Sequence, residues 1–286
     1  MGEGAGAPRL TDRLDRLVTA NRFTIAVVFP LVGAVGLLAS AEGLLPPPLA
    51  FNPLFVLAGT LVMRLPLIAG LAPLVDRRAV AGLGALTAYA YAVELVGVRT
   101  GFPYGEFRYL VDLGPMLFGQ VPLGLPVFFF PLVVNSYLLV LLLLGDGADR
   151  ASRRLPAVVL SVLAMDLVLD PGAVSLGFWA YADGGVYGVP LSNYLGWTLS
   201  AIVAVAVLDR AFPYRALRAR LDRCRFLLDD LVSFVLLWGA IDAYFGNWAS
   251  VGVAALFGAG LLWTDRFDFD VGPGAVGLRR VWRWRG

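Results

Sequence analysis

The sequence predicts an all-α fold, a polytopic membrane bundle of about eight transmembrane helices with both termini on the cytoplasmic side. Composition is the first reason. Of the 286 residues, 59% are hydrophobic and only 15% are charged, and the mean hydropathy is +0.76. Soluble domains carry about 25% charged residues. Most of this chain is therefore expected to lie within the bilayer, as a multi-pass protein of the cell membrane.

A series of apolar segments is the second reason, because each is long enough to cross a hydrocarbon core about 30 Å thick. They cover residues 23–41, 51–75, 80–98, 121–144, 155–178, 194–209, 228–246 and 248–264. The last two are the least distinct, since little more than Asn247 separates them. These segments form one domain, 23–264, between a cytoplasmic N-terminal segment, 1–22, and a basic cytoplasmic tail, 265–286.

The positions of the arginines agree with this count and set the orientation. Cytoplasmic loops of membrane proteins collect basic residues. With the N-terminus inside, 20 of the 23 basic residues, all of them arginine, fall in the N-terminal segment, the tail and three alternate loops. Only Arg99 and Arg108 fall in outer loops, and Arg64 lies within the second predicted span.

The residue types that the sequence lacks exclude several kinds of chemistry. It contains no lysine and no histidine, which excludes a retinal Schiff base, histidine-ligated haem and a histidine-box di-iron site. The single cysteine, Cys224, can form neither an internal disulfide nor a cysteine-based metal site. No cofactor motif is present either. We therefore expect no metal, no cofactor and no nucleic-acid partner.

Acidic residues inside the predicted spans are the candidate functional groups. Asp166 and Asp170 lie four residues apart in one apolar run, so they share a helix face. Glu94 lies near the outer end of the third span. A carboxyl group at bilayer depth is costly and usually faces the bundle interior or a cavity. We expect Arg64 to form a structural ion pair with one of them, with Asp166 as its candidate partner, which leaves the other acids without a cation.

Two long outer loops, 99–120 and 179–193, lie on the same side of the membrane as most of these acids. They combine glycine, proline and aromatic residues, which indicates ordered caps over a cavity. Unpaired carboxyls in such a cavity tend to keep their protons and can donate them. The chemistry left is hydration, dehydration, isomerisation or cyclisation of a hydrophobic molecule. Asp242, near the outer surface, is explained equally well by simple solvation.

Several runs of sequence also resemble a known family. They are YAVELVGVRTGFPYGEFRYLVDLGP (91–115), VPLGLPVFFFPLVVNSYLLVLLLLGD (121–146), DLVLDPGAVSLGFWAY (166–181), YGVPLSNYLGW (187–197) and LLDDLVSFVLLWGAIDAYFGNW (227–248). Together they are similar to the membrane-bound carotenoid hydratases, over about residues 20–250. The resemblance implies water addition across the terminal double bonds of a long acyclic carotenoid. In that family the expected conversion is bisanhydrobacterioruberin to bacterioruberin, through a tertiary carbocation.

With this chemistry, the catalytic residues are expected among Asp170, Glu94 and Asp166. Either Asp170 or Glu94 would donate the proton, while Asp166 would be its partner or orient the water. The substrate-binding candidates are Tyr91, Asn135, Trp179, Tyr187, Asn193 and Trp197. The asparagines would position water, and the aromatic faces would stabilise a cation. Each has a structural alternative, because aromatic side chains suit the membrane interface and Asn135 suits an interhelical hydrogen bond.

Two other functions remain open. Asp166 and Asp170 form a DxxxD pair that could hold Mg²⁺ against a diphosphate, as in an intramembrane prenyltransferase. Such enzymes carry a second aspartate-rich motif on the cytoplasmic side, whereas the acidic run at 265–270 lies past the last span and is interpreted as a solvated edge. A proton-coupled transporter would use buried acids equally well. The expected partners are a long-chain carotenoid, the lipid bilayer and other membrane enzymes of carotenoid synthesis.

Overall fold

The computed structural model describes residues 10–269 and confirms the all-α prediction. The main helices are α1 (Leu10–Phe23), α2 (Phe29–Ala41), α3 (Pro53–Leu71), α4 (Arg77–Thr100), α5 (Leu125–Leu144), α6 (Ala151–Ser175), α7 (Leu191–Ala211), α8 (Tyr214–Arg223), α9 (Asp229–Phe245) and α10 (Trp248–Trp263). Short helical turns are η1 (Thr24–Val28), η2 (Ala72–Leu74), η3 (Gly145–Asp149) and η4 (Arg225–Leu228). The strands are β1 (Phe107–Tyr109), β2 (Met116–Leu117), β3 (Val121–Pro122) and β4 (Trp179–Tyr181).

Six continuous helical segments are long and apolar enough to cross a membrane, as expected of a multi-pass membrane protein. They are Leu10–Ala41, Pro53–Leu74, Arg77–Thr100, Leu125–Asp149, Ala151–Leu176 and Leu191–Ala211. The seventh and eighth predicted spans correspond to α9 and α10, which are 17 and 16 residues long. Both are shorter than the roughly 20 residues that a spanning helix needs. Length and composition therefore support six of the eight predicted spans.

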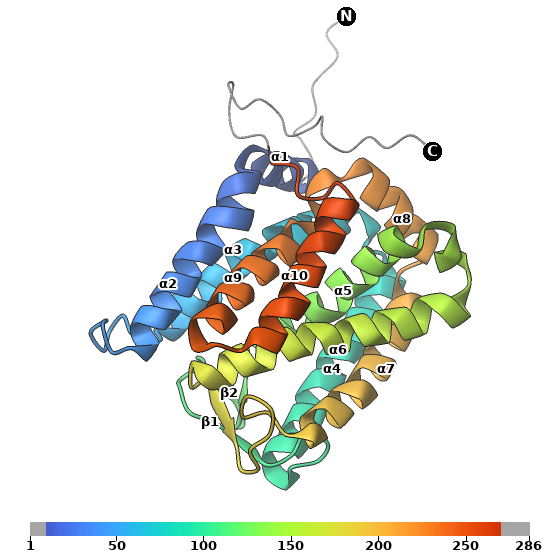
Figure 1. Cartoon of the computed structure of the whole chain (residues 1–286). Helices are drawn as coiled ribbons and strands as arrows, with labels where there is room; N and C mark the ends of the chain where they lie inside the picture. Colours follow the sequence, from blue (N-terminus) through green and yellow to red (C-terminus); the bar gives the residue numbers. More distant parts are fainter. Residues whose placement is uncertain (1–9, 270–286) are drawn as a thin grey trace, which may run out of the picture.

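Helix α6 is the central helix of the bundle, packed against α5, α7, α9 and α10. In Figure 1 it runs across the middle of the molecule, with α9 and α10 above it and α7 below it. Its buried face carries apolar side chains together with Asp166 and Asp170, which are 0% and 3% exposed. The high cost of a charge in lipid predicts that these two acids face the bundle interior, and the structure shows that they do.

Helix α4 has well-defined ends, and they fix the height of Glu94 within the bundle. At its start, the Asp76 side chain accepts a hydrogen bond from the Ala79 N–H at 2.8 Å, which satisfies one of the free donors of the first turn. At its end, Gly101 adopts a φ of 73°, the left-handed conformation that commonly terminates helices. Along its length α4 packs against α7.

The two outer loops are ordered and are joined to each other by a short antiparallel sheet. Strand β1 pairs with β4 in a register that places Phe107 opposite Tyr181 and Tyr109 opposite Trp179. Strands β2 and β3 form a second pair within the first loop. Figure 1 shows the strands at the end of the bundle opposite to α1 and α8. The sheet therefore closes one end of the helical bundle, as the loop composition predicted.

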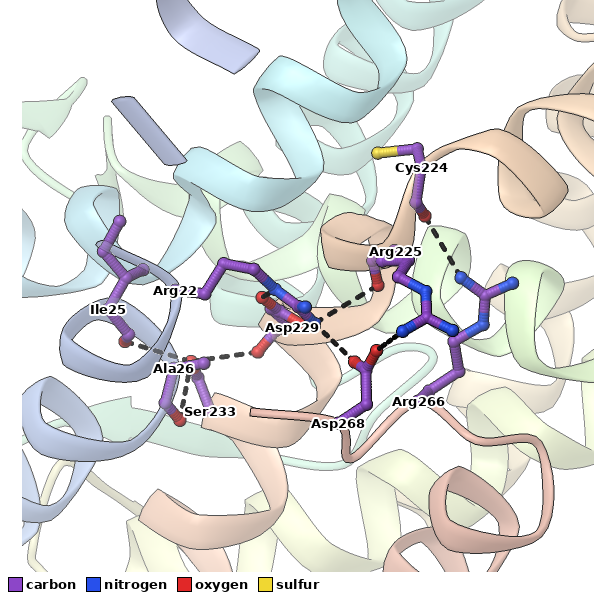
Figure 2. A network of polar contacts seen from close by, with 9 residues as sticks. All are labelled: Arg22, Ile25, Ala26, Cys224, Arg225, Asp229, Ser233, Arg266 and Asp268. Carbon is purple, nitrogen blue, oxygen red and sulfur yellow. Dashed lines mark hydrogen bonds and ion pairs between the residues drawn. The ribbon is translucent and has the colours of Figure 1, made fainter. Parts of the chain in front are cut away.

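The opposite end is held by a polar network shown in Figure 2. Arg22 on α1 contacts Asp229 at 2.8 Å and Asp268 at 2.9 Å, and Arg225 contacts Asp268 at 2.6 Å. Arg266 donates to two backbone carbonyls at the end of α8 and just beyond it. The network ties the first helix and the last described residues to the start of α9. Of the two predicted flanking segments, residues 1–9 and 270–286 lie outside the described residues.

The contact between α4 and α7 gives a test of this packing. A Cβ added at Gly82 would lie 2.4 Å from the Cβ of Ala211, whereas a Cβ at Gly84 would meet nothing within 4 Å. We expect Gly82→Ala to destabilise the protein by about 1–3 kcal/mol through overpacking. Gly84→Ala should be neutral or slightly stabilising, because alanine favours the helix. Thermal unfolding of both variants in detergent measures the two effects. Equal shifts of the unfolding temperature in the two variants would contradict this helix pairing.

Candidate functional site

A cavity of about 120 Å³ lies between the β1–β4 sheet and the helices beneath it. Its wall is formed by Glu94, Tyr104, Phe107, Tyr109, Leu113, Pro122, Leu125, Phe128, Phe129, Leu132, Leu169, Asp170, Phe178, Trp179, Tyr181, Asn193, Trp197 and Trp238. Most of these side chains are aliphatic or aromatic. The wall is therefore apolar, with a few polar groups placed at fixed points, as is usual for small-molecule sites.

The two acids of the wall each accept a hydrogen bond from a tyrosine. The hydroxyl of Tyr109 donates to Glu94 Oε1, and that of Tyr181 donates to Asp170 Oδ2 at 3.0 Å. The Asn193 amide also donates to Asp170 Oδ2. All of these partners are neutral, so they orient the carboxyl groups without supplying a counterion.

The register of the β1–β4 sheet explains why both tyrosines reach the acids. Residues directly opposite each other in an antiparallel pair lie on one face, and so do residues two apart along a strand. Phe107, Tyr109, Trp179 and Tyr181 therefore share a face, and all four line the cavity. The alternation of aromatic residues in each strand is the sequence feature that produces this aromatic roof.

The tyrosines of the roof are held in their protonated form. Burial, and then the nearby Glu94, raise the pKa of the Tyr109 phenol well above its usual range. Burial and the neighbouring Asp170 and Asp166 raise the pKa of Tyr181 in the same direction. Because a protonated phenol donates its hydrogen, these raised pKa values favour the form in which both side chains donate to the acids.

Asp166 lies one helical turn before Asp170, behind the cavity wall. It is 0% exposed, and its Oδ2 accepts a hydrogen bond from the Asn193 amide at 3.3 Å. One amide therefore bridges the two aspartates. Within residues 10–269, none of Glu94, Asp166 and Asp170 forms an ion pair. For Glu94 and Asp170 this agrees with the expectation that they lack a cation, whereas Asp166 was expected to pair with Arg64.

The predicted substrate-binding residues divide into two groups. Trp179, Asn193 and Trp197 line the cavity, and the Trp197 ring stacks on Phe129 with centroids 5.9 Å apart. Tyr91 and Tyr187 do not form part of its wall. The Tyr91 hydroxyl donates to a backbone carbonyl, that of Leu123, and the Tyr187 hydroxyl accepts from a backbone N–H at the start of α10. Their hydroxyls thus serve the loops around the cavity.

The suggested partner of Arg64 was wrong. Arg64 pairs with Asp230 on α9, not with Asp166, and its Nε donates to the Val127 carbonyl at 3.3 Å. Asn135, which we expected to position water, donates its amide to the same Asp230. The physical reason is that α3 packs against α5 and α9, so the Arg64 side chain meets Asp230 first. These three residues form a separate buried cluster outside the cavity wall.

One further acid and one aromatic residue differ from the sequence interpretation. Asp242, for which solvation was a sufficient explanation, is 0% exposed and accepts a hydrogen bond from the Asn247 amide at 3.0 Å. Tyr109 was not among the candidates, although it contacts Glu94 directly. The alternating pattern of the segment 107–109 was the available signal, but only strand pairing shows which way its side chains point.

Comparison with known proteins places the chain in a family. The profile of the carotenoid biosynthesis proteins matches residues 51–261, a range that includes every residue of the cavity wall. The chain belongs to the carotenoid biosynthesis protein family. It is 66% identical to the bisanhydrobacterioruberin hydratase of Haloarcula japonica, over 96% of this chain and 93% of that relative. No solved structure matches the chain.

These findings confirm the resemblance drawn from the sequence motifs. The relative is named as a hydratase, the class of enzyme that the resemblance implies. Because the match covers nearly the whole of both proteins, it includes the outer loops as well as the helices. The cavity is therefore part of a carotenoid biosynthesis protein.

The buried cluster of Arg64 and Asp230 can be tested separately from the cavity. We expect Asp230→Leu to destabilise this member of the family by about 3–5 kcal/mol, because it leaves a buried guanidinium without its partner. The double variant Arg64→Met with Asp230→Leu should recover most of that loss. Thermal unfolding of the single and double variants in detergent measures both effects. Equal destabilisation by the two would show that the ion pair is not the source.

Proposed function

We propose that this protein is a carotenoid hydratase that adds water across the terminal double bonds of bisanhydrobacterioruberin to give bacterioruberin. Family membership and the name of the 66% identical relative support the substrate and the reaction. The observation that carries the proposal is the placement of Glu94 and Asp170 on the wall of an aromatic cavity, with no arginine partner within the described residues. Acid-base chemistry on a hydrocarbon needs acids in this kind of environment.

The reaction requires only proton transfer and one water molecule for each double bond. A protonated carboxyl donates H⁺ to the less substituted alkene carbon, which leaves a tertiary cation on the neighbouring carbon. Water then attacks this cation and forms the C–O bond, and its proton passes to a carboxylate. The sum is addition of water, with no oxidation, and the two carboxyl groups have exchanged a proton.

The geometry suggests how the residues share these roles. Asp170 and Glu94 face the cavity and act as acid and base, while Asp166 is linked to Asp170 through the Asn193 amide. The aromatic faces of Trp179 and Trp197 line the same space and stabilise the developing cation. Tyr109 and Tyr181 hold the acids in place. The remainder of the long polyene would lie outside this small cavity, against lipid.

We also propose that all eight predicted segments cross the bilayer with both termini in the cytoplasm. Residues 1–22 and 265–286 are then cytoplasmic and residues 23–264 form the transmembrane domain. The arginine-rich α8 lies at the end of the bundle opposite to the strands, in agreement with the arginine distribution (Figure 1). The turn η4 directly precedes α9, so this helical path covers residues 225–245, long enough to span.

The most direct test is expression in a host that accumulates bisanhydrobacterioruberin. Mass analysis of the extracted carotenoids should show products heavier by one and two water molecules. The empty vector provides the control for background hydration. Unchanged carotenoid would contradict the proposal. Magnesium-dependent release of diphosphate from a prenyl substrate would also contradict it and would support the prenyltransferase alternative.

Removal of the two cavity acids should abolish most of the activity. We expect Asp170→Asn and Glu94→Gln each to lower the hydration rate by about 10²–10⁴-fold, the usual contribution of a general acid or base. Asp183→Asn, a matched change at an exposed position of the loop 179–193, should retain the wild-type rate. Full hydration by the Asp170→Asn variant in cells would remove Asp170 from the catalytic group.

The tyrosines of the roof should contribute less than the acids that they contact. We expect Tyr109→Phe and Tyr181→Phe to lower the hydration rate by about tenfold, because each loses one hydrogen bond to a carboxyl group, worth about 1.5 kcal/mol. Tyr244→Phe, which removes an exposed hydroxyl on α9, is the matched control. Hydration rates are measured in membranes with added carotenoid. Wild-type rates in all three variants would contradict a role of Tyr109 and Tyr181 in supporting the acids.

A further inference from the structure

Three buried oxygen atoms near the cavity have no hydrogen-bond partner among the described residues. They are Asp166 Oδ1, the Tyr194 hydroxyl and Asp242 Oδ2. Asp166 and Asp242 are each 0% exposed. Buried side-chain oxygens in folded proteins are nearly always satisfied by a protein group or by ordered water. Three exceptions in one region therefore need a common explanation.

One of the three oxygens belongs to α6 itself, and the other two belong to α7 and α9, which pack against α6. Tyr194 follows Asn193 on α7, and the Asn193 amide contacts both Asp166 and Asp170. The Tyr194 phenol lies within electrostatic range of Asp166, Asp170 and Asp242. Asp242, on α9, also lies close to α6, since its Oδ1 would lie 3.2 Å from a Cβ added at Gly172, two residues after Asp170.

The unsatisfied hydrogen-bonding atoms of these groups are suited to binding water. A phenol can donate one hydrogen bond and accept others, and each carboxyl oxygen offers acceptor sites. An internal water molecule typically makes about three hydrogen bonds to buried groups that would otherwise be unsatisfied. No arginine forms an ion pair with either aspartate within residues 10–269.

We propose that Asp166, Tyr194 and Asp242 form an internal water-binding site between α6, α7 and α9, which supplies the water consumed in hydration. This inference rests on the proposed function. The cavity wall is mostly aromatic and aliphatic, so a water molecule finds few hydrogen-bond partners beside the alkene. A polar site directly behind Asp170 and Asn193 holds the nucleophile next to the reaction and keeps bulk water out.

The route from this site to the substrate passes Asn193. The Asn193 side chain lies on the cavity wall and also reaches Asp166 behind it. A water molecule leaving the site can therefore exchange hydrogen bonds with this amide as it enters the cavity. There its oxygen forms the new C–O bond and its proton passes to the cavity carboxylate, as in the proposed reaction. Tyr194 and Asp242 are positioning residues in this scheme, because they do not touch the alkene.

The test compares hydration rates at full and at reduced water activity, in membranes with added bisanhydrobacterioruberin and an osmolyte. For the wild type, a site that binds water should keep the rate nearly constant as water activity falls moderately. We expect Tyr194→Phe and Asp242→Asn to lower kcat by about tenfold, leave KM for the carotenoid unchanged, and make the rate fall steeply with water activity. Ser161→Ala, which removes another unpartnered buried hydroxyl on α6, is the matched control.

The outcomes separate this proposal from the proposed function. A wild-type protein that adds no water refutes the function itself. A wild-type hydratase whose two variants keep the wild-type dependence on water activity refutes the water site alone, even if their rates fall for structural reasons. A cryo-EM map of the full chain gives a readout independent of activity. Density within hydrogen-bonding distance of Asp166 Oδ1 and the Tyr194 hydroxyl is expected, and an apolar, empty space there would overturn the proposal.

Discussion

The cost of placing a carboxyl group inside an apolar bundle is the constraint on which this structure depends. The protein meets that cost in two ways. Towards the α1 and α8 end, acids are paired with arginines, as in the contacts of Asp229 with Arg22 and of Asp209 with Arg154, each at 2.8 Å. Around the cavity, acids are contacted by the hydroxyl and amide groups of neutral side chains. Paired acids link neighbouring segments of the bundle, while the acids around the cavity have no arginine partner within residues 10–269 and, in the proposed function, transfer protons.

The β1–β4 sheet turns two loops into a functional part of the cavity. A two-stranded sheet is marginally stable alone, so its order depends on packing against the helical bundle. Its aromatic face is half-buried and lines the cavity, where Trp179 and Tyr109 lie edge to face with centroids 6.4 Å apart. The same face carries the tyrosines that orient Glu94 and Asp170. Packing of the roof and orientation of the acids therefore arise from one set of side chains.

The chemistry and the membrane setting are linked through the apolar cavity wall. In the proposed reaction, a carotenoid end reaches the acids without leaving a hydrophobic environment, and the cation formed there meets aromatic faces before it meets bulk water. Water is then the scarce reactant. A hydratase of this kind needs polar groups close to the cavity but outside its wall, which is where Asp166, Tyr194 and Asp242 lie.

The sequence by itself predicted the all-α fold, the six longest apolar helices and the family. Apolar length and arginine placement are local properties, because a helix in lipid satisfies its own backbone hydrogen bonds. Glu94 and Asp170 were identified as acids within apolar runs, and Trp179, Asn193 and Trp197 through the chemistry that the family resemblance implies. The structure brings all five to one cavity.

Only the tertiary structure decided which side chains meet. Arg64 contacts Asp230 because α3 packs on α9, and periodicity along α3 gives no information about its neighbours. Tyr109 and Tyr181 meet the acids only through the pairing of strands about seventy residues apart, and Asn135 and Tyr91 are directed elsewhere. Partners of this kind depend on helix order, rotation and strand register. These are global properties of the packed chain, so short stretches of sequence do not encode them separately.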